Sequence, residues 1–258
     1  KRQSQMVHVG LPGRGQLTLR VEGADGVLGN WAGAKFTAND PDMVADGQAR
    51  TGGAGSPASG RDAGFILIDP DHPHSFRYQN GARFFPMGDT AYFLIGHPKD
   101  VIARYIDVRR QHKFNFVRMM AMAEGHWPFG GDPRNPDYTT IDETSLRKLD
   151  WVFDYAAGKG MNIELILWGY GVAGGEGLWA HPAHQNLWID TLVRRYKDRP
   201  NLFMYTVANE FERYPDGRYA YSPGDVDWAK DVAVRIREFD KVHPVGVHPS
   251  HWVTEDTP

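Results

Sequence analysis

The sequence predicts an α/β fold of the (β/α)8 TIM-barrel type, incomplete, with about five β/α units, preceded by a small β-sandwich-like segment. From residue 84 onward, short apolar runs typical of buried strands alternate with amphipathic runs of helical period. The strand starts lie roughly 30 to 45 residues apart, as expected for βαβ units. Near-continuous apolar strands that alternate with helices indicate a parallel sheet covered by those helices.

The same alternation fits two arrangements, a doubly wound open sheet and a barrel that stops after its fifth strand. An eight-unit barrel takes about 250 residues, more than follow the first segment of this 258-residue chain. The long loops favour the barrel, because each follows the C-terminal end of a predicted strand, and barrels build their active sites from such loops. These loops cover residues 88–90, 124–138, 169–184 and 210–223.

The first part of the chain differs from the rest in composition. Residues 16–22 alternate like a half-buried strand, and Lys35–Ala38 is a weaker strand. Residues 46–60 are rich in Gly, Ser, Ala and Pro, the composition of a linker or loop. We therefore expect two domains, a β-sandwich-like segment or its remnant plus linker over 1–62 and the partial barrel over 63–258.

The elements of the second domain follow from their periods and breakers. A small hairpin is predicted over residues 76–85, because Asn80-Gly81 is a strong turn dipeptide, and Gly160 is expected to stop the second helix. The predicted strands are 84–91, 114–121, 161–168, 202–208 and 243–248. The predicted helices are 99–112, 143–159, 182–197 and 225–241.

Composition excludes several classes of function. A net charge of −3 and a pI near 6.4 provide no basic surface for nucleic acid. The absence of cysteine excludes disulfides, Cys-zinc sites and a thiol nucleophile. No apolar run approaches the roughly 20 residues that a membrane span needs, and no signal peptide is visible at Lys1. Eight Trp and eleven Tyr suit stacking on flat apolar ligands, although core packing uses them equally.

Polar and aromatic side chains recur near the C-terminal ends of all five predicted strands. Apolar groups would stand there if these positions served only the core. Because the C-terminal ends of parallel strands meet at one face, we expect these side chains to share a site. They are Asp89, Arg118, Trp168, Asn209, Glu210 and His248.

Glu210 is the sharpest candidate among them. A carboxylate at the end of a buried strand costs free energy and is expected there only if it has a function. We therefore interpret Glu210 as a general acid/base. Arg118 can hold an acidic partner ionised, and Asn209 can bind a hydroxyl group of the ligand. A structural ion pair is an equal interpretation for Arg118 and Asp89. The side chains that can stack on a sugar ring are Trp127, Trp168 and Trp252.

Two other motifs carry less weight. Residues 169–174 match the dinucleotide-binding fingerprint in letters, but the sequence continues as loop instead of opening a helix. The histidine pairs at 181/184 and 248/251 have the spacing of zinc ligands, yet proline interrupts both pairs and no acidic third ligand is near. We interpret His248 as a hydrogen-bonding wall residue and expect no metal and no cofactor.

Four stretches in order carry a resemblance to a known family. They are residues 76–92 (FRYQNGARFFPMGDTAY), 114–118 (FNFVR), 208–210 (ANE) and 237–248 (REFDKVHPVGVH). Together they resemble the apiosidase-like glycoside hydrolases, which belong to the large (β/α)8 clan of retaining glycosidases, over about residues 62 to 252. Many members of that family carry an N-terminal β-sandwich.

The resemblance implies a retaining mechanism with two carboxylates, in which Glu210 is the acid/base. In the clan the nucleophile is a glutamate at the end of the seventh strand, so we expect it to be missing from a chain with five predicted strands. Glu124 and Glu176 are predicted on the same face but do not match that position.

We therefore expect a glycosidase acting on a plant, algal or microbial glycan, secreted or periplasmic, with a carbohydrate as its partner and neither nucleic acid nor membrane. Two alternatives stay open at this point. The first is a non-catalytic carbohydrate-binding or scaffold protein, and the second is a metal-dependent barrel hydrolase.

Overall fold

The computed structural model describes two parts of the 258-residue chain. The chain divides into two compact units, Lys1–Pro57 and Ala58–Pro258. The boundary falls within the linker-like stretch of the sequence. The described residues are 3–10, 16–23 and 35–38 in the first unit, and 63–169, 178, 182–210 and 223–248 in the second.

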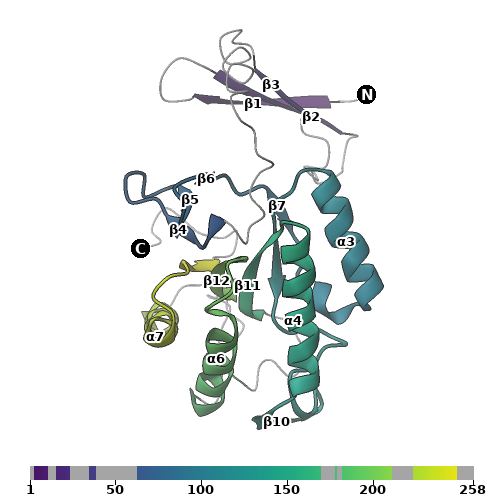
Figure 1. Cartoon of the computed structure of the whole chain (residues 1–258), viewed down its shortest axis with the longest axis vertical. Coiled ribbons are helices and arrows are strands. Elements are labelled where there is room, and N and C mark those ends of the chain that lie inside the picture. Colours follow the sequence, from purple (N-terminus) through teal and green to yellow (C-terminus); the bar gives the residue numbers. More distant parts are fainter. Residues whose placement is uncertain are drawn as a thin grey trace. The chain divides into compact units, whose positions relative to one another are not determined.

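The described residues of the first unit form a three-stranded antiparallel sheet in the order β1-β2-β3 (Figure 1). The two strands predicted here are confirmed. The strand β1 was not predicted. Only three of its eight residues are apolar, at alternating and adjacent positions, which is a weak strand pattern. The β-sandwich stays a prediction. The strands are β1 Gln3–Gly10, β2 Gln16–Gly23 and β3 Lys35–Ala38.

The second unit is organised around a five-stranded parallel sheet in the order β13-β12-β11-β8-β7. Neighbouring strands follow one another along the chain without reversal. A doubly wound sheet reverses its order at a switch point, so this order is that of a barrel, and the predicted barrel-type topology is confirmed. The strands are β7 Gly88–Thr90, β8 Phe116–Met120, β11 Asn162–Gly169, β12 Leu202–Asn209 and β13 Val245–His248.

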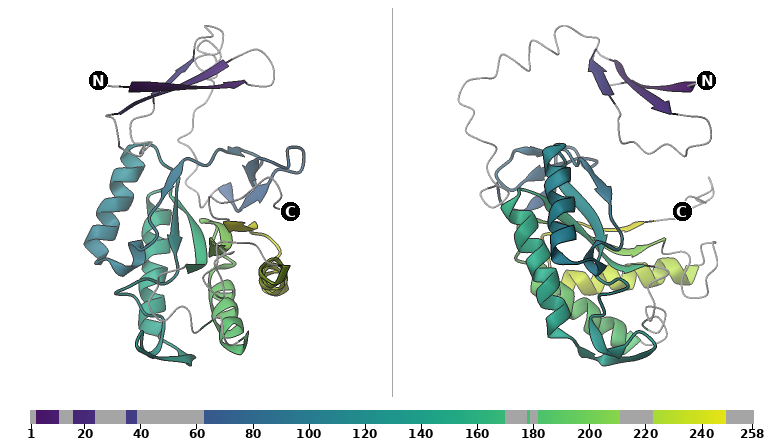
Figure 2. Two further views of the ribbon diagram at one scale, coloured as in Figure 1. Left: turned by 180° about the vertical axis from the view of Figure 1, so that it is seen from behind. Right: turned by 90° about the vertical axis from the view of Figure 1, so that its right-hand side faces the viewer.

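Among the described residues, a helix lies between each two consecutive strands of this sheet. Right-handed crossovers place such helices on one face of the sheet, where Figures 1 and 2 show them. The second of these helices, α4, buries a helical stripe that includes Leu149, Val152 and Phe153. Gly160 follows its end with φ +67°. All four predicted helices are confirmed to within about two residues. They are α3 Lys99–Gln111, α4 Glu143–Gly158, α6 Pro182–Tyr196 and α7 Pro223–Phe239.

The predicted hairpin over residues 76–85 is confirmed as β5 Phe76–Tyr78 and β6 Arg83–Phe84, with Gly81 at φ +89° in its turn. It extends into a three-stranded sheet with β4 Ile66–Ile68. The first barrel strand, predicted as 84–91, is shorter than expected. Pro86 lacks an N–H to donate to a ladder, so the run divides between β6 and β7.

The loop expected after β8 contains a second antiparallel hairpin, β9 Phe129–Asp132 and β10 Asn135–Ile141. Asp132 Oδ1 closes its turn by accepting hydrogen bonds from the N–H groups of Arg134 and Asn135 at 2.7 and 3.1 Å. Glycine and proline in this stretch conceal the strands in the sequence. The hairpin leads directly to the N-terminus of α4.

The small sheet β4-β5-β6 covers the N-terminal ends of the barrel strands. Phe203, at the start of β12, meets the rings of Phe76, Phe84 and Phe116 edge-on at centroid distances of 4.9, 5.1 and 5.4 Å. Edge-to-face contacts at these distances are favourable. This aromatic cluster covers the N-terminal ends of β8 and β12. The opposite end of the sheet, where the long loops follow the strands, is therefore the end at which we look for a ligand site.

A buried aspartate–histidine hydrogen bond lies between α7 and β13. The Asp240 and His243 side chains are 2% and 0% exposed, and Asp240 Oδ2 is 2.7 Å from His243 Nδ1. The other oxygen accepts hydrogen bonds from the N–H groups of Val242 and His243 at 2.8 and 3.0 Å. Burial alone would raise the pKa of Asp240, but the bonds from His243 and Val242 outweigh it and hold this pKa at about 2.

This pair predicts a defined loss of stability in acid. A carboxyl whose pKa falls from 3.8 in the unfolded chain to about 2 in the folded one stabilises the fold above pH 3.8, and this contribution disappears as the pH falls through 2. Allowing for solvent screening, Asp240→Asn should lower the free energy of unfolding by about 1–2 kcal/mol at pH 7 and flatten its dependence on pH below 4. Urea denaturation between pH 2 and pH 7 measures both. Exposed Asp227→Asn is the control, and identical acid profiles for Asp240→Asn and the wild type would contradict the assignment.

Candidate active site

Three barrel strands bring an arginine, a glutamate and an asparagine into contact. Arg118 of β8 donates from Nε to Glu164 Oε1 of β11 at 2.9 Å and from Nη2 to Asn209 Oδ1 of β12 at 3.2 Å. Arg118 and Asn209 are each 7% exposed. Thr206 Oγ1 donates to the same Glu164 oxygen at 2.6 Å. We call these four residues the Arg118 cluster.

The electrostatics of this cluster are balanced. The Arg118 and Glu164 side chains are 9% and 13% exposed, and an isolated charge in such surroundings would be strongly penalised. Each charge instead offsets the other through a charge-assisted hydrogen bond. The guanidinium also lies over the Tyr92 ring, 5.4 Å from its centroid. Arg118 is therefore held on several sides, and its planar donor fork fixes the Asn209 amide.

A register shift at the end of β12 shapes the site. Thr206 pairs with Gly246 and Asn209 with His248, so β12 advances three residues where β13 advances two. Strict alternation would place Thr206 and Asn209 on opposite faces of the sheet. Both contact the Arg118–Glu164 pair, so the bulge is the feature that directs Asn209 to it.

Glu210 follows this bulge with a left-handed backbone, φ +53°. Lys113 is the one other residue besides glycine with positive φ in the part of the chain that the structure describes. A side chain in this region costs about 1–2 kcal/mol, and such strain collects where the surroundings require a particular direction. The half-buried Glu210 therefore stands at the C-terminal end of β12, directly after the asparagine that Arg118 fixes.

Four of the predicted site residues lie near one another: Asn209, at the end of β12, is contacted by Arg118 from the middle of β8, is followed by Glu210 and pairs in register with His248. His248 is half-buried. Trp252 lies outside the described residues, so its position on the sugar-binding wall stays a prediction.

Three other predicted site residues make different contacts. The Asp89 carboxylate is bound by Tyr105 and Arg109 of α3 and makes no contact with the Arg118 cluster. Trp127 donates from Nε1 to the Gly130 carbonyl at 3.1 Å and packs on Phe129 in the hairpin. Trp168 is 1% exposed and meets Trp228 of α7 edge-on at 5.5 Å. Their ligand-binding roles stay predictions, and their observed contacts are structural.

Sequence reasoning missed Glu164, Thr206 and Tyr92. Glu164 left a signal, because it is the charged residue inside the otherwise apolar run 161–168. A carboxylate in a buried strand requires a cationic partner, and Arg118, at the matching position of the neighbouring strand, is in register with it. Thr206 and Tyr92 carry no comparable signal.

The other motifs give no second centre. Within the described ranges, no group of three or more His, Cys, Asp and Glu side chains could hold a metal ion. His181 and His251 lie outside these ranges, as do Glu176 and most of the glycine motif, whereas His184 lies 5.5 Å from the Tyr138 ring. No helix among the described residues is both long and apolar enough for a membrane span.

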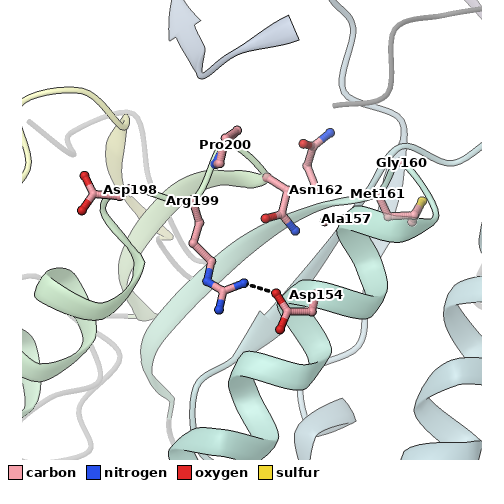
Figure 3. Close-up of a pocket in the computed structure, with 9 residues that line it drawn as sticks. Asp154, Ala157, Gly160, Met161, Asn162, Asp198, Arg199 and Pro200 are labelled. Atoms are coloured by element: carbon pink, nitrogen blue, oxygen red, sulfur yellow. Dashed lines mark hydrogen bonds and ion pairs between the residues drawn. The ribbon is translucent and has the colours of Figure 1, made fainter. Parts of the chain in front are cut away.

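A cavity of about 220 Å³ lies at the opposite end of the sheet, where β11 and β12 begin (Figure 3). Asp154, Asn162 and Arg199 are among its lining residues. The Arg199 guanidinium is already paired with Asp154, as the dashed line in Figure 3 marks. This cavity shares no residue with the Arg118 cluster, and its third charged group, Asp198, is paired with Lys197.

A barrel-type sheet with polar groups at its C-terminal end is the architecture of TIM-barrel glycoside hydrolases, and solved structures confirm the fold. A putative glycoside hydrolase from Bacteroides vulgatus matches 96% of this chain with a TM-score of 0.64 and 19% identity. An endo-1,4-β-mannanase from Rhizomucor miehei matches 75% with a TM-score of 0.59 and 17% identity. A family 5 mannosidase from the same fungus, in complex with mannosyl-fructose, matches 75% with a TM-score of 0.58 and 15% identity. The chain spans 47%, 63% and 57% of these three structures.

The apiosidase-like catalytic domain matches residues 71–257, and the chain belongs to this family. The resemblance seen in the sequence is thereby confirmed. Comparison with curated protein sequences gives no significant match.

The Arg118 cluster makes a prediction about stability. Arg118→Met should destabilise the protein by about 3–5 kcal/mol, because it leaves the Glu164 charge buried without a partner. Arg118→Met combined with Glu164→Gln should recover much of that loss. The free energy of urea unfolding measures both effects, and Arg134→Met, at an exposed position of the β9-β10 turn, is the control. If the single and double variants lose the same stability, charge compensation is not what Arg118 contributes.

Proposed function

We propose that this protein is a glycoside hydrolase that acts on a plant, algal or microbial glycan, as a secreted or periplasmic enzyme, by a retaining mechanism with two carboxylates. The observation that carries the proposal is the position of Glu210. It ends the fourth barrel strand in a left-handed backbone, directly after an asparagine that a buried arginine fixes. Membership of the apiosidase-like family supports this interpretation.

Glu210 acts as the general acid/base in this proposal. As the bond between the sugar and the leaving oxygen breaks, Glu210 donates its proton to that oxygen, and the nucleophilic carboxylate bonds to the anomeric carbon. In the second step Glu210 takes a proton from water, the water oxygen bonds to the anomeric carbon, and the nucleophile departs. The two carboxyl groups of such a pair stand about 5–5.5 Å apart.

The proposal places the nucleophile outside the five barrel strands. The family resemblance assigns it to a later strand, and Glu164 is an unsuitable substitute because its charge is already engaged by Arg118 and Thr206. Both hydrogen bonds go to Oε1 of Glu164 and stabilise the negative charge of the carboxylate, which weakens it as a nucleophile.

Asn209 and the Arg118 cluster position the sugar in this proposal. Arg118 donates a hydrogen bond to Oδ1 of Asn209 and thereby orients the amide. The Nδ2 group of the same amide can then donate to a sugar hydroxyl. A donor fixed in advance binds without losing side-chain freedom. The complex of the similar Rhizomucor mannosidase with mannosyl-fructose supports a sugar as the ligand.

Replacement of the acid/base tests the mechanism. In a form of the protein that turns over glycosides, Glu210→Gln should reduce kcat about 10²–10⁴-fold on glycosides with poor leaving groups. It should have a much smaller effect on the first step with nitrophenyl glycosides, whose leaving group needs no proton. Steady-state kinetics on any glycoside that the wild type turns over measure the difference. Glu238→Gln, exposed on α7, is the matched control, and unchanged turnover in Glu210→Gln would exclude the assignment.

The chain taken alone tests the position of the nucleophile. We expect the 258-residue protein to bind sugar without hydrolysing it, because the proposal puts the second carboxylate outside the five described barrel strands. Product release from nitrophenyl glycosides, together with isothermal titration, separates the two properties. Retaining hydrolysis by this chain would show that one of its own carboxylates is the nucleophile.

A further inference from the structure

A second polar pocket lies on the helix side of the sheet, at the N-termini of α3 and α4. It has a volume of about 410 Å³ and shares no residue with the Arg118 cluster. Both helices begin after the C-terminal ends of barrel strands, so the pocket belongs to the same end of the fold as Glu210. Its lining residues are Lys99, Gly125, His126, Thr144, Ser145, Arg147 and Lys148.

The charge of this pocket is positive, because three basic residues and no acidic residue line it. None of its three basic residues has an ion pair with any described residue. Lys99 Nζ lies 5.0 Å from the centroid of the Trp151 ring, and Arg147 Nη2 donates to Thr144 Oγ1 at 2.9 Å. Burial and the nearby charge of Lys99 lower the pKa of Lys148. Two like charges that repel each other across a pocket are stabilised by an anion placed between them.

A buried histidine adds an unsatisfied polar atom to the wall. His126 is 3% exposed, and its Nε2 atom has no hydrogen-bond partner. Leaving such an atom buried and unpaired costs about 1–3 kcal/mol, so it requires an explanation. His126 lines the pocket, and in the tautomer that carries the proton on Nε2 an anion bound there would supply the missing partner.

The acidic groups nearby do not fill this role. Asp142 caps α4 by accepting hydrogen bonds from the N–H groups of Thr144 and Ser145, each at 3.0 Å. Its carboxylate and the first N–H groups of the helix are therefore occupied with each other, which leaves side chains as the donors of the pocket. Glu143 pairs with Arg195 at 3.0 Å, and no acidic residue lines the pocket.

We propose that this pocket binds an oxyanion, a carboxylate, sulfate or phosphate group, between Lys99, Lys148 and His126. Such groups accept several charge-assisted hydrogen bonds at once, which matches a wall that has donors and no acceptor charge. The volume lies in the range of small-molecule sites, about 300–1,000 Å³. The oxyanion can therefore be a free ion or the acidic group of a small organic molecule such as an acidic sugar.

Isothermal titration of the whole 258-residue protein tests the proposal with sodium sulfate, sodium phosphate, galacturonate and uncharged galactose, all at ionic strength matched with sodium chloride. At least one anionic probe should bind more tightly than chloride. Lys99→Met with Lys148→Met, which keeps the apolar stems and removes both charges, should weaken that binding about tenfold or more. Binding of galactose, if any, should not change.

Lys241→Met is the matched control, since it removes an exposed lysine at the opposite end of the sheet. Binding of galacturonate without sulfate or phosphate would assign the site to an organic acid, and the reverse result would assign it to a free ion. The nitrogen NMR signals of the His126 ring should shift on titration of the wild type. Failure of all anionic probes to bind, or equal affinity in the wild type and the double variant, would overturn the proposal.

Discussion

The buried ion pair between Arg118 and Glu164 is the interaction on which the C-terminal end of this sheet depends. It ties β8 to β11 at matching positions and, through Thr206 and Asn209, reaches β12. Apolar residues of similar volume often stabilise a fold as well as a buried ion pair does, since the pair must first lose its hydration. Its contribution here is direction, because a planar arginine held by a glutamate fixes the orientation of an asparagine on a third strand.

The orientation of the Asn209 side chain also depends on the irregular end of β12. The regular part of the strand delivers apolar side chains to both sides of a covered sheet. The bulge directs Asn209 to Arg118, and the left-handed backbone of Glu210 then changes the direction of the chain at the strand end. Strain of this kind persists when the surrounding contacts over-determine it. The hydrogen bonds of the Arg118 cluster, made by a residue directly adjacent to Glu210, are such contacts.

The order of the elements could be predicted from the sequence because it follows from local periods. Strands of apolar residues and helices with an apolar stripe are visible residue by residue, and their alternation implies the barrel-type winding that the sheet shows. The hairpin β9-β10 escaped prediction because its pairing is made between strands containing glycine and proline. At Pro86 the error was the reverse: the apolar pattern predicted a strand over 84–91, and the observed strand β7 is shorter.

The site was predictable only in part, for a related reason. Position at a strand end shows which end of the sheet a residue occupies, but it does not show which face its side chain takes. Asp89 and Trp168 both satisfy the first condition, yet their contacts are with Arg109 of α3 and Trp228 of α7. Arg118 reaches the site from the middle of β8, and Asn209 meets it from the end of β12. Glu164 could have been found by asking where the counter-charge of Arg118 lies.

The two polar regions at this end of the fold use charge in opposite ways. In the Arg118 cluster a cation is fully offset by a carboxylate, and the same holds for the helix layer, where Arg195 pairs with Asp150 and Arg235 with Asp190 at 2.8 and 2.7 Å. A compensated charge orients its neighbours and holds elements together, but its electrostatic attraction for a ligand is weak. Lys99 and Lys148 have no such partner, and His126 behind them has an unsatisfied nitrogen. Lys99 is exposed and Lys148 half-buried, so water solvates much of their charge, whereas His126 is buried and its Nε2 atom has no hydrogen-bond partner. A ligand that completes that hydrogen bond is the simplest physical reason to retain a histidine there.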